Sequence, residues 1–122
     1  MKTDEAEELD KILTSLQNVS DIEGAAIITR NGILISSNLP PDIDGQKFAA
    51  MSASMVGASE TAAALLKSFA KRIIVEIERG KIIALGAGPK AILVVSINEG
   101  ANIENLTPEL EKHRKDIMKI FK

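Results

Sequence analysis

The stretch KRIIVEIERGKIIALGAGPKAILVVSI, residues 71–97, contains three runs rich in β-branched residues, separated by two short turns that contain glycine. Runs of this composition predict strands, and turns this short connect antiparallel neighbours. The sequence therefore predicts an antiparallel meander with strands over residues 72–78, 82–87 and 91–97. The segment GAGPK between the last two strands lacks the spacing of a phosphate-binding loop and is interpreted as a hairpin turn.

A further pair of strands is predicted upstream of the meander. The runs 24–30 and 33–38 flank Asn31-Gly32, the strongest short-range signal for a two-residue hairpin turn. Such a turn gives three pairs: Arg30 with Ile33, Ile28 with Ile35, and Ala26 with Ser37. Ile27 and Leu34 would lie on the opposite face, so both faces of the hairpin are apolar. We therefore expect helices to cover both faces of the sheet.

Three helices complete the predicted order. Helical spacing of apolar residues predicts one helix over 3–18, alanine-rich composition predicts a second over 48–66 with Asp44 as its cap, and Thr107-Pro108 predicts the start of a third. The first helix is acidic and the last is basic, so we expect them side by side on one sheet face, with the central helix on the other. The result is an α+β fold in the order α-β-β-α-β-β-β-α, predicted as a single domain over residues 1–122.

Composition narrows the classes of function. The 122 residues carry a formal net charge of -2 and 2% aromatics, which argues against a nucleic-acid partner. No cysteine is present, and the acidic start of the chain does not resemble a signal peptide, so we expect a cytoplasmic protein. The helix over 48–66 has too few strongly lipid-preferring side chains to predict a membrane span.

The sequence does not predict an enzyme. His113 is the only histidine and lies at helical spacing between Leu110 and Ile117, which indicates a half-buried or flanking helix residue and not a catalytic base. A single histidine without cysteine is a poor basis for a zinc site or a Ser-His-Asp triad. We therefore expect no catalytic residue, no metal and no cofactor.

The central helix divides into three faces at 100° per residue. The bulkiest stripe, which we expect to lie on the sheet, comprises Phe48, Met51, Met55, Ala58, Ala62, Leu65 and Phe69. A stripe of small residues that would let another helix approach closely comprises Ala50, Ser54, Gly57, Thr61 and Ala64. The third face is weakly charged for a free surface and comprises Ala49, Ala53, Val56, Glu60, Ala63 and Lys67. Either the alanines of this third face merely supply helix propensity, or the face binds a protein partner.

The strand over 72–78 is predicted to be an edge of the sheet. An unpaired edge this rich in isoleucine and valine invites aggregation, whereas pairing with the same strand of a second copy would close it with two-fold symmetry. The sequence therefore predicts a homodimer built from this strand and the small-residue stripe. The strand residues assigned to that interface are Ile73, Val75 and Ile77.

The chain resembles the roadblock family, which includes the dynein roadblock light chain, MglB-type regulators of Ras-like GTPases and scaffold subunits of lysosomal signalling complexes. The resemblance extends over residues 9–106 and rests on VSDIEGAAIITRNGILISSNLP, the Ala/Ser/Met-rich helix and AILVVSINEGANI, in that order. Asp21 and Gly24 stand where many relatives have a glycine pair. The resemblance implies a profilin-like fold with a five-stranded antiparallel sheet, and dimerisation through the central helix and third strand.

The resemblance also implies a function. Family members typically bind Ras-like small GTPases, so the expected role is a homodimeric regulator or scaffold that modulates GTP hydrolysis. Transferred to this chain, the partner surface would be the paired central helices, with Val56, Glu60 and Lys67 as contacts. The candidate arginine fingers are Arg30, Arg72, Arg79 and Arg114, and no pattern singles one out. The alternatives are a small-ligand sensor module and an assembly adaptor without GTPase contact.

Overall fold

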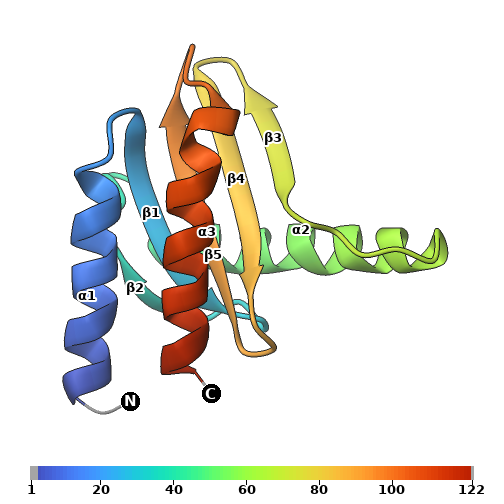
Figure 1. Cartoon of the computed structure of the whole chain (residues 1–122), viewed down its shortest axis with the longest axis horizontal. Coiled ribbons are helices and arrows are strands. Elements are labelled where there is room, and N and C mark those ends of the chain that lie inside the picture. Colours follow the sequence, from blue (N-terminus) through green and yellow to red (C-terminus); the bar gives the residue numbers. More distant parts are fainter. Residues whose placement is uncertain (1–2, 122) are drawn as a thin grey trace.

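The structure is a computed structural model that describes residues 3–121. Its elements are α1 (Thr3–Gln17), β1 (Ile22–Thr29), β2 (Leu34–Ser37), α2 (Gly45–Leu65), β3 (Ile73–Ile77), β4 (Gly80–Ala87), β5 (Ala91–Asn98) and α3 (Ile103–Ile120). The five strands form one antiparallel sheet in the order β2-β1-β5-β4-β3 (Figure 1). The predicted α+β class and element order are confirmed.

The sheet separates two layers of helices (Figure 1). On one face, α1 and α3 lie side by side and share a large buried cluster with the sheet that includes Leu9, Leu16, Leu93 and Leu110. On the other face, α2 packs on a smaller cluster. The predicted placement of the terminal helices on one face and the central helix on the other is therefore confirmed. No helix among residues 3–121 is long and apolar enough to cross a membrane.

The first hairpin has a different register from the predicted one. Ala26 pairs with Ser37 as expected, but a β-bulge after Ile27 pairs Ile28 with Leu34 and not with Ile35. Because a one-residue shift turns side chains to the other face, Leu34 packs on the α2 side and Ile35 on the α1 and α3 side. The prediction of the opposite placement is wrong.

The start of the last helix also differs from its prediction. Asn102 caps α3, and its side-chain oxygen accepts from the backbone N–H groups of Glu104 and Asn105. Pro108 consequently lies inside the helix, five residues beyond its first residue. The predicted Asp44 cap of α2 is confirmed, because its carboxylate accepts from the backbone N–H of Lys47 at 3.1 Å.

The face of α2 that packs on the sheet is not the predicted one. Ala49, Ser52 and Val56 are the buried residues of α2, whereas Met51, Leu65 and Phe69 of the predicted stripe are 61%, 80% and 76% exposed. Ala58 and Ala62 are also exposed, and only Phe48 and Met55 of that stripe pack against the α2-side cluster. The sheet itself supplies bulk there through Ile28, Ile92 and Val94, so small helix residues allow close approach. The buried face is turned by about one residue, or 100°.

Candidate functional site

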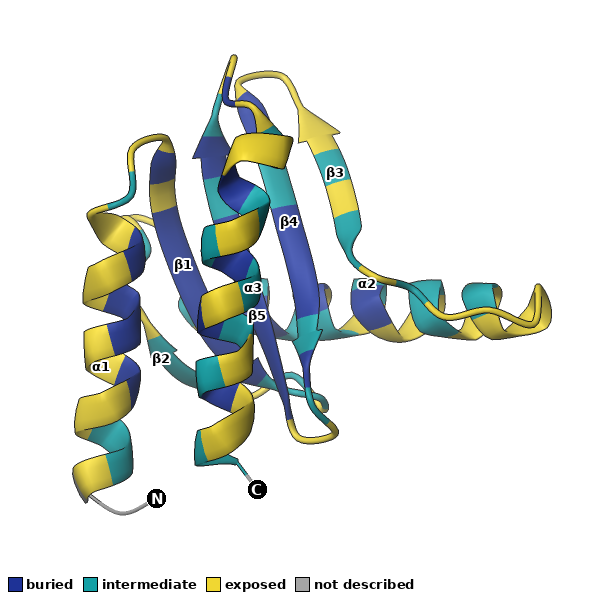
Figure 2. Cartoon of the chain, viewed as in Figure 1, coloured by how far each residue is buried: buried dark blue, intermediate teal, exposed yellow. Residues whose placement is uncertain are grey.

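The C-terminal half of α2 extends past the edge of the sheet. In Figure 1 the helix crosses behind the sheet and continues beyond β3, and Figure 2 shows its buried residues confined to the half that lies over the sheet. All three buried residues of α2 fall between positions 49 and 56. We name residues 57–65 the protruding arm. None of the buried residues of α2 lies on the arm, so the arm lacks the packing on the sheet that usually stabilises an amphipathic helix.

Large apolar side chains are exposed on the arm and on the connection that follows it. Leu65 is 80% exposed, Leu66 82% and Phe69 76%. Fully burying one such side chain in an interface would contribute roughly 1.5–3 kcal/mol of favourable free energy relative to leaving it exposed to water. A cluster of exposed apolar residues at one end of a soluble domain indicates a surface that another molecule covers.

The edge strand β3 borders this surface. β3 pairs with β4 on one side and with no other strand of the described chain, which confirms the predicted edge. Ile74 is 41% exposed and Ile77 46%. Its open backbone groups and apolar side chains have the features of an edge that pairs with another chain.

The residues predicted to form a dimer interface are accessible in the single chain. Gly57, Thr61 and Ala64 are exposed on the arm, and a Cβ added at Gly57 would meet no atom within 4 Å. Ser54 is also exposed, and Ala50, Ile73 and Val75 are half-buried. The arm and β3 therefore bring most of these residues to the same edge of the molecule, and their role in a dimer stays a prediction.

The residues predicted to bind a partner are not a continuous accessible surface. Ala49 is 0% exposed and Val56 1%, because both pack on the sheet, so the prediction that they contact a partner is wrong. Ala53 and Ala63 are half-buried on the same side. Lys67 alone of this set is exposed, just beyond the end of α2, with a left-handed φ of 59°.

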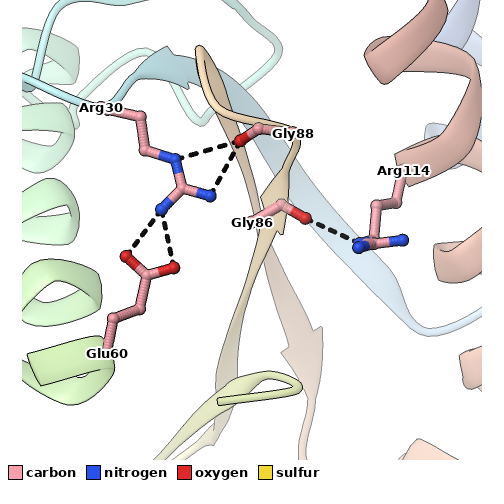
Figure 3. A network of polar contacts seen from close by, with 5 residues as sticks. All are labelled: Arg30, Glu60, Gly86, Gly88 and Arg114. Carbon is pink, nitrogen blue, oxygen red and sulfur yellow. Dashed lines mark hydrogen bonds and ion pairs between the residues drawn. The ribbon is translucent and has the colours of Figure 1, made fainter. Parts of the chain in front are cut away.

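Glu60 of the predicted partner surface is held within the chain. Nη1 of Arg30 donates to both carboxylate oxygens of Glu60 at 2.7 Å, and Nε and Nη2 of Arg30 donate to the Gly88 carbonyl (Figure 3). From the other side of the β4–β5 hairpin, Nε of Arg114 donates to the Gly86 carbonyl at 2.7 Å. The two arginines thus donate to carbonyls at the end of β4 and in the following turn, where β3 no longer runs beside β4.

The four candidate arginine fingers differ in how far contacts within the chain restrict their side chains. Arg30 and Arg114 are tied to backbone carbonyls and to Glu60 and Glu111. Arg72 is half-buried, and its Nε is buried without a hydrogen-bond partner. Arg79 is exposed in the turn between β3 and β4, so it is the arginine with the greatest conformational freedom.

His113 is more deeply buried than predicted. It is 3% exposed, and its Nε2 lies 3.4 Å from Ser15 Oγ and 3.3 Å from a carboxylate oxygen of Glu109. Its position between α1 and α3 indicates a structural residue. Among residues 3–121, no group of three His, Asp or Glu side chains is arranged to hold a metal ion.

Sequence reasoning missed the exposed residues Met51, Leu65, Leu66 and Phe69 as surface features. Bulky side chains predict a buried helix face, and the sequence carries no signal for where the sheet ends beneath α2. It also missed that Arg30, Arg72 and Arg114 converge, because these residues come from three segments far apart in the sequence.

Comparison with known proteins places the chain in a family. The model of the Roadblock/LC7 domain matches residues 8–96, which include most of α1, all of α2 and the complete sheet except the last residues of β5. The uncharacterized protein MJ0310 of Methanocaldococcus jannaschii is 31% identical over 96 residues, covering 78% of this chain and 83% of that protein.

Two solved structures show the extent of the likeness in fold. Myxococcus xanthus MglB superimposes with a TM-score of 0.89 at 21% identity, covering 99% of this chain and 92% of that one. Profilin IA of Acanthamoeba castellanii gives a TM-score of 0.66 at 16% identity, covering 90% and 95% of the two chains. The expected profilin-like fold is therefore confirmed. The match of the family model over most of the sequence shows that this chain belongs to the Roadblock/LC7 domain family.

Proposed function

We propose that this protein is a homodimeric regulator or scaffold, without enzymatic activity of its own, that binds a Ras-like small GTPase. The observation that carries the proposal is the protruding arm of α2, whose exposed apolar end lies next to the unpaired edge strand β3. We treat residues 1–122 as one domain, because α1 and α3 from opposite ends of the chain share one core cluster.

A second copy of the chain fits both features at once. If β3 pairs with β3 of the partner, the partner's sheet continues past the edge and passes beneath the arm of α2. The small residues Gly57, Thr61 and Ala64 then allow the two α2 helices to approach closely, and the partner's sheet packs against the side of the arm that faces β3. A single two-fold symmetric contact would therefore both pair the open edge strand and cover the protruding helix.

The burial of Ala49 and Val56 moves the proposed GTPase surface to another face of α2. Met51, Ala58, Ala62 and Leu65 are exposed and point away from the sheet, about 100° round from the small-residue stripe. In the proposed dimer, two copies of this stripe would form one platform on the outer side of the paired helices. Such a weakly charged platform suits a protein partner better than a small molecule.

Regulation of the GTPase would then come from binding and not from a donated side chain. Arg30 and Arg114 are engaged with carbonyls and carboxylates of their own chain, which makes them poor candidates for an arginine finger. Arg79 is exposed but lies in the β3–β4 turn, away from α2. We propose that any effect on hydrolysis comes from positioning of the GTPase's own residues.

The direct test uses small GTPases from the same organism, loaded with a GTP analogue or GDP, and measures binding and hydrolysis with and without this protein. Met51→Glu should weaken binding, while Lys112→Glu on the outer side of α3 should leave it unchanged. Equal binding by the wild type and Met51→Glu would exclude the α2 platform. Absence of binding to any GTPase in either nucleotide state would contradict the proposed function and favour an assembly adaptor.

A further inference from the structure

A basic cavity lies at the end of the sheet where β4 extends beyond β3. β3 begins at Ile73, opposite Ala84, so the last residues of β4 have no strand neighbour on that side. Beside them is a cavity of about 500 Å³, within the range of roughly 300–1,000 Å³ typical of small-ligand sites. Its lining residues come from α2, the segment before β3, the β4–β5 hairpin, α3 and the turn after β1.

Cations outnumber carboxylates in this cavity. Arg30, Lys71, Arg72 and Arg114 line it, against Glu60 and Glu111. The chain as a whole carries a formal net charge of -2, so this concentration of positive charge runs against the average of the molecule. Like charges repel at close range, and a bound anion would relieve that repulsion.

Two of the four cations have their charge compensated. Arg30 forms an ion pair with Glu60 at 2.7 Å, and Arg114 lies 3.4 Å from Glu111. Neither Lys71 nor Arg72 forms an ion pair within residues 3–121. The Nε of Arg72 is buried without a hydrogen-bond partner, which costs free energy unless something else supplies the acceptor.

Gly86 of the β4–β5 hairpin leaves room for the side chain of Arg30 in the cavity wall. Gly86 and Gly88 line it, and a Cβ added at Gly86 would collide with Nη2 of Arg30. Figure 3 shows Arg30 and Arg114 reaching this hairpin from opposite sides, each held by a carbonyl. Arg30 and Arg114 therefore form a fixed part of the cavity wall, and the cations left available to an anion are Lys71 and Arg72.

We infer that this cavity binds a small phosphorylated molecule through its phosphate group, with Lys71 and Arg72 as the principal charge partners. Two uncompensated cations match the charge of a phosphate dianion. Phe69, which also lines the cavity and is 76% exposed, offers an apolar surface for the remainder of the ligand. This site would give the protein a ligand-binding function separate from contact with a GTPase.

The test titrates the ¹⁵N-labelled protein with inorganic pyrophosphate at constant low ionic strength and follows backbone amide shifts. Saturable shifts at Ala70, Gly86 and Gly88 are expected, and calorimetry should give one site per chain. Lys71→Gln and Arg72→Gln should each weaken binding about tenfold, the loss of one charged hydrogen bond. Lys67→Gln and Arg79→Gln remove cations outside the cavity and should not change the affinity.

Three results would overturn the inference: no saturable binding, shifts spread over the surface, or equal weakening in the cavity variants and the two controls. Spectra of the unliganded variants show whether Arg72→Gln still folds. Lys71 is exposed, so Lys71→Gln provides the decisive comparison if Arg72→Gln does not fold.

Discussion

Arg30 and Glu60 are joined across the α2 face of the sheet, with Nη1 of Arg30 2.7 Å from each oxygen of the Glu60 carboxylate. Arg30 follows β1, and Glu60 lies on the protruding arm of α2. The pair therefore fixes the arm to the end of the sheet at a point where apolar contacts are few. This ion pair is a direct polar link between the arm and the rest of the chain.

Glu60→Gln should lower the free energy of unfolding by about 1 kcal/mol, since the pair is only partly shielded from water. Urea denaturation measures this change. Glu78→Gln, an exposed carboxylate in the turn before β4, is the matched control and should have little effect. Equal effects of the two substitutions would show that the Arg30 contact contributes nothing specific.

Gly57→Leu should convert the proposed dimer to a folded monomer. The single chain has open space around Gly57, and leucine favours a helix over glycine by about 0.5–1 kcal/mol, so the protomer should not be destabilised. Sedimentation velocity measures the size and circular dichroism the helix content. Gly57→Ala adds only a methyl group and should keep more of the dimer. A dimeric Gly57→Leu protein would exclude close contact at this stripe.

Ile77→Lys should also disrupt the dimer, whereas Ile74→Lys should disrupt it less. The two side chains are similarly exposed, at 46% and 41%, but they lie on opposite faces of β3. Ile77 lies on the α2 face, where the partner's arm would cover it, and Ile74 lies on the face of α1 and α3. Sedimentation velocity at matched concentrations compares the two. A larger effect of Ile74→Lys would contradict a dimer contact on the α2 face of β3.

His113→Met should change the free energy of unfolding by less than about 1 kcal/mol, because an apolar side chain of similar size suits a site where Nδ1 is buried without a partner. His113→Ala should cost about 2 kcal/mol or more, since it leaves a cavity between α1 and α3. Urea denaturation of both variants separates packing from polar contact. If methionine proves as harmful as alanine, the contacts with Ser15 and Glu109 dominate.

The order of elements could be predicted from local patterns, but two orientations could not. The Asn31-Gly32 signal located the hairpin correctly, yet the bulge after Ile27 reversed the faces of Leu34 and Ile35. In α2, bulk predicted that Met51 and Leu65 face the sheet, whereas the sheet provides the bulk and Ala49 and Val56 fit against it. Both errors arise because a side chain's surroundings depend on the partner element as well as on its own spacing.

The candidate surfaces likewise include one feature that the sequence predicts and one that it does not. The edge position of β3 followed from its place at the end of the meander and is confirmed. The convergence of Arg30, Arg72 and Arg114 could not be read from the sequence, because it depends on how the ends of β1, β3 and α3 meet around the β4–β5 hairpin. Long-range placement of this kind has no local signature.

Sedimentation equilibrium of the wild-type protein over a wide concentration range tests the central claim most directly. The claim is that a second copy covers the protruding arm of α2 and the β3 edge. The account predicts a mass of twice the 13.1 kDa of one chain, falling towards one chain in Gly57→Leu. A wild-type protein that keeps the mass of a single chain at the highest concentrations would contradict it.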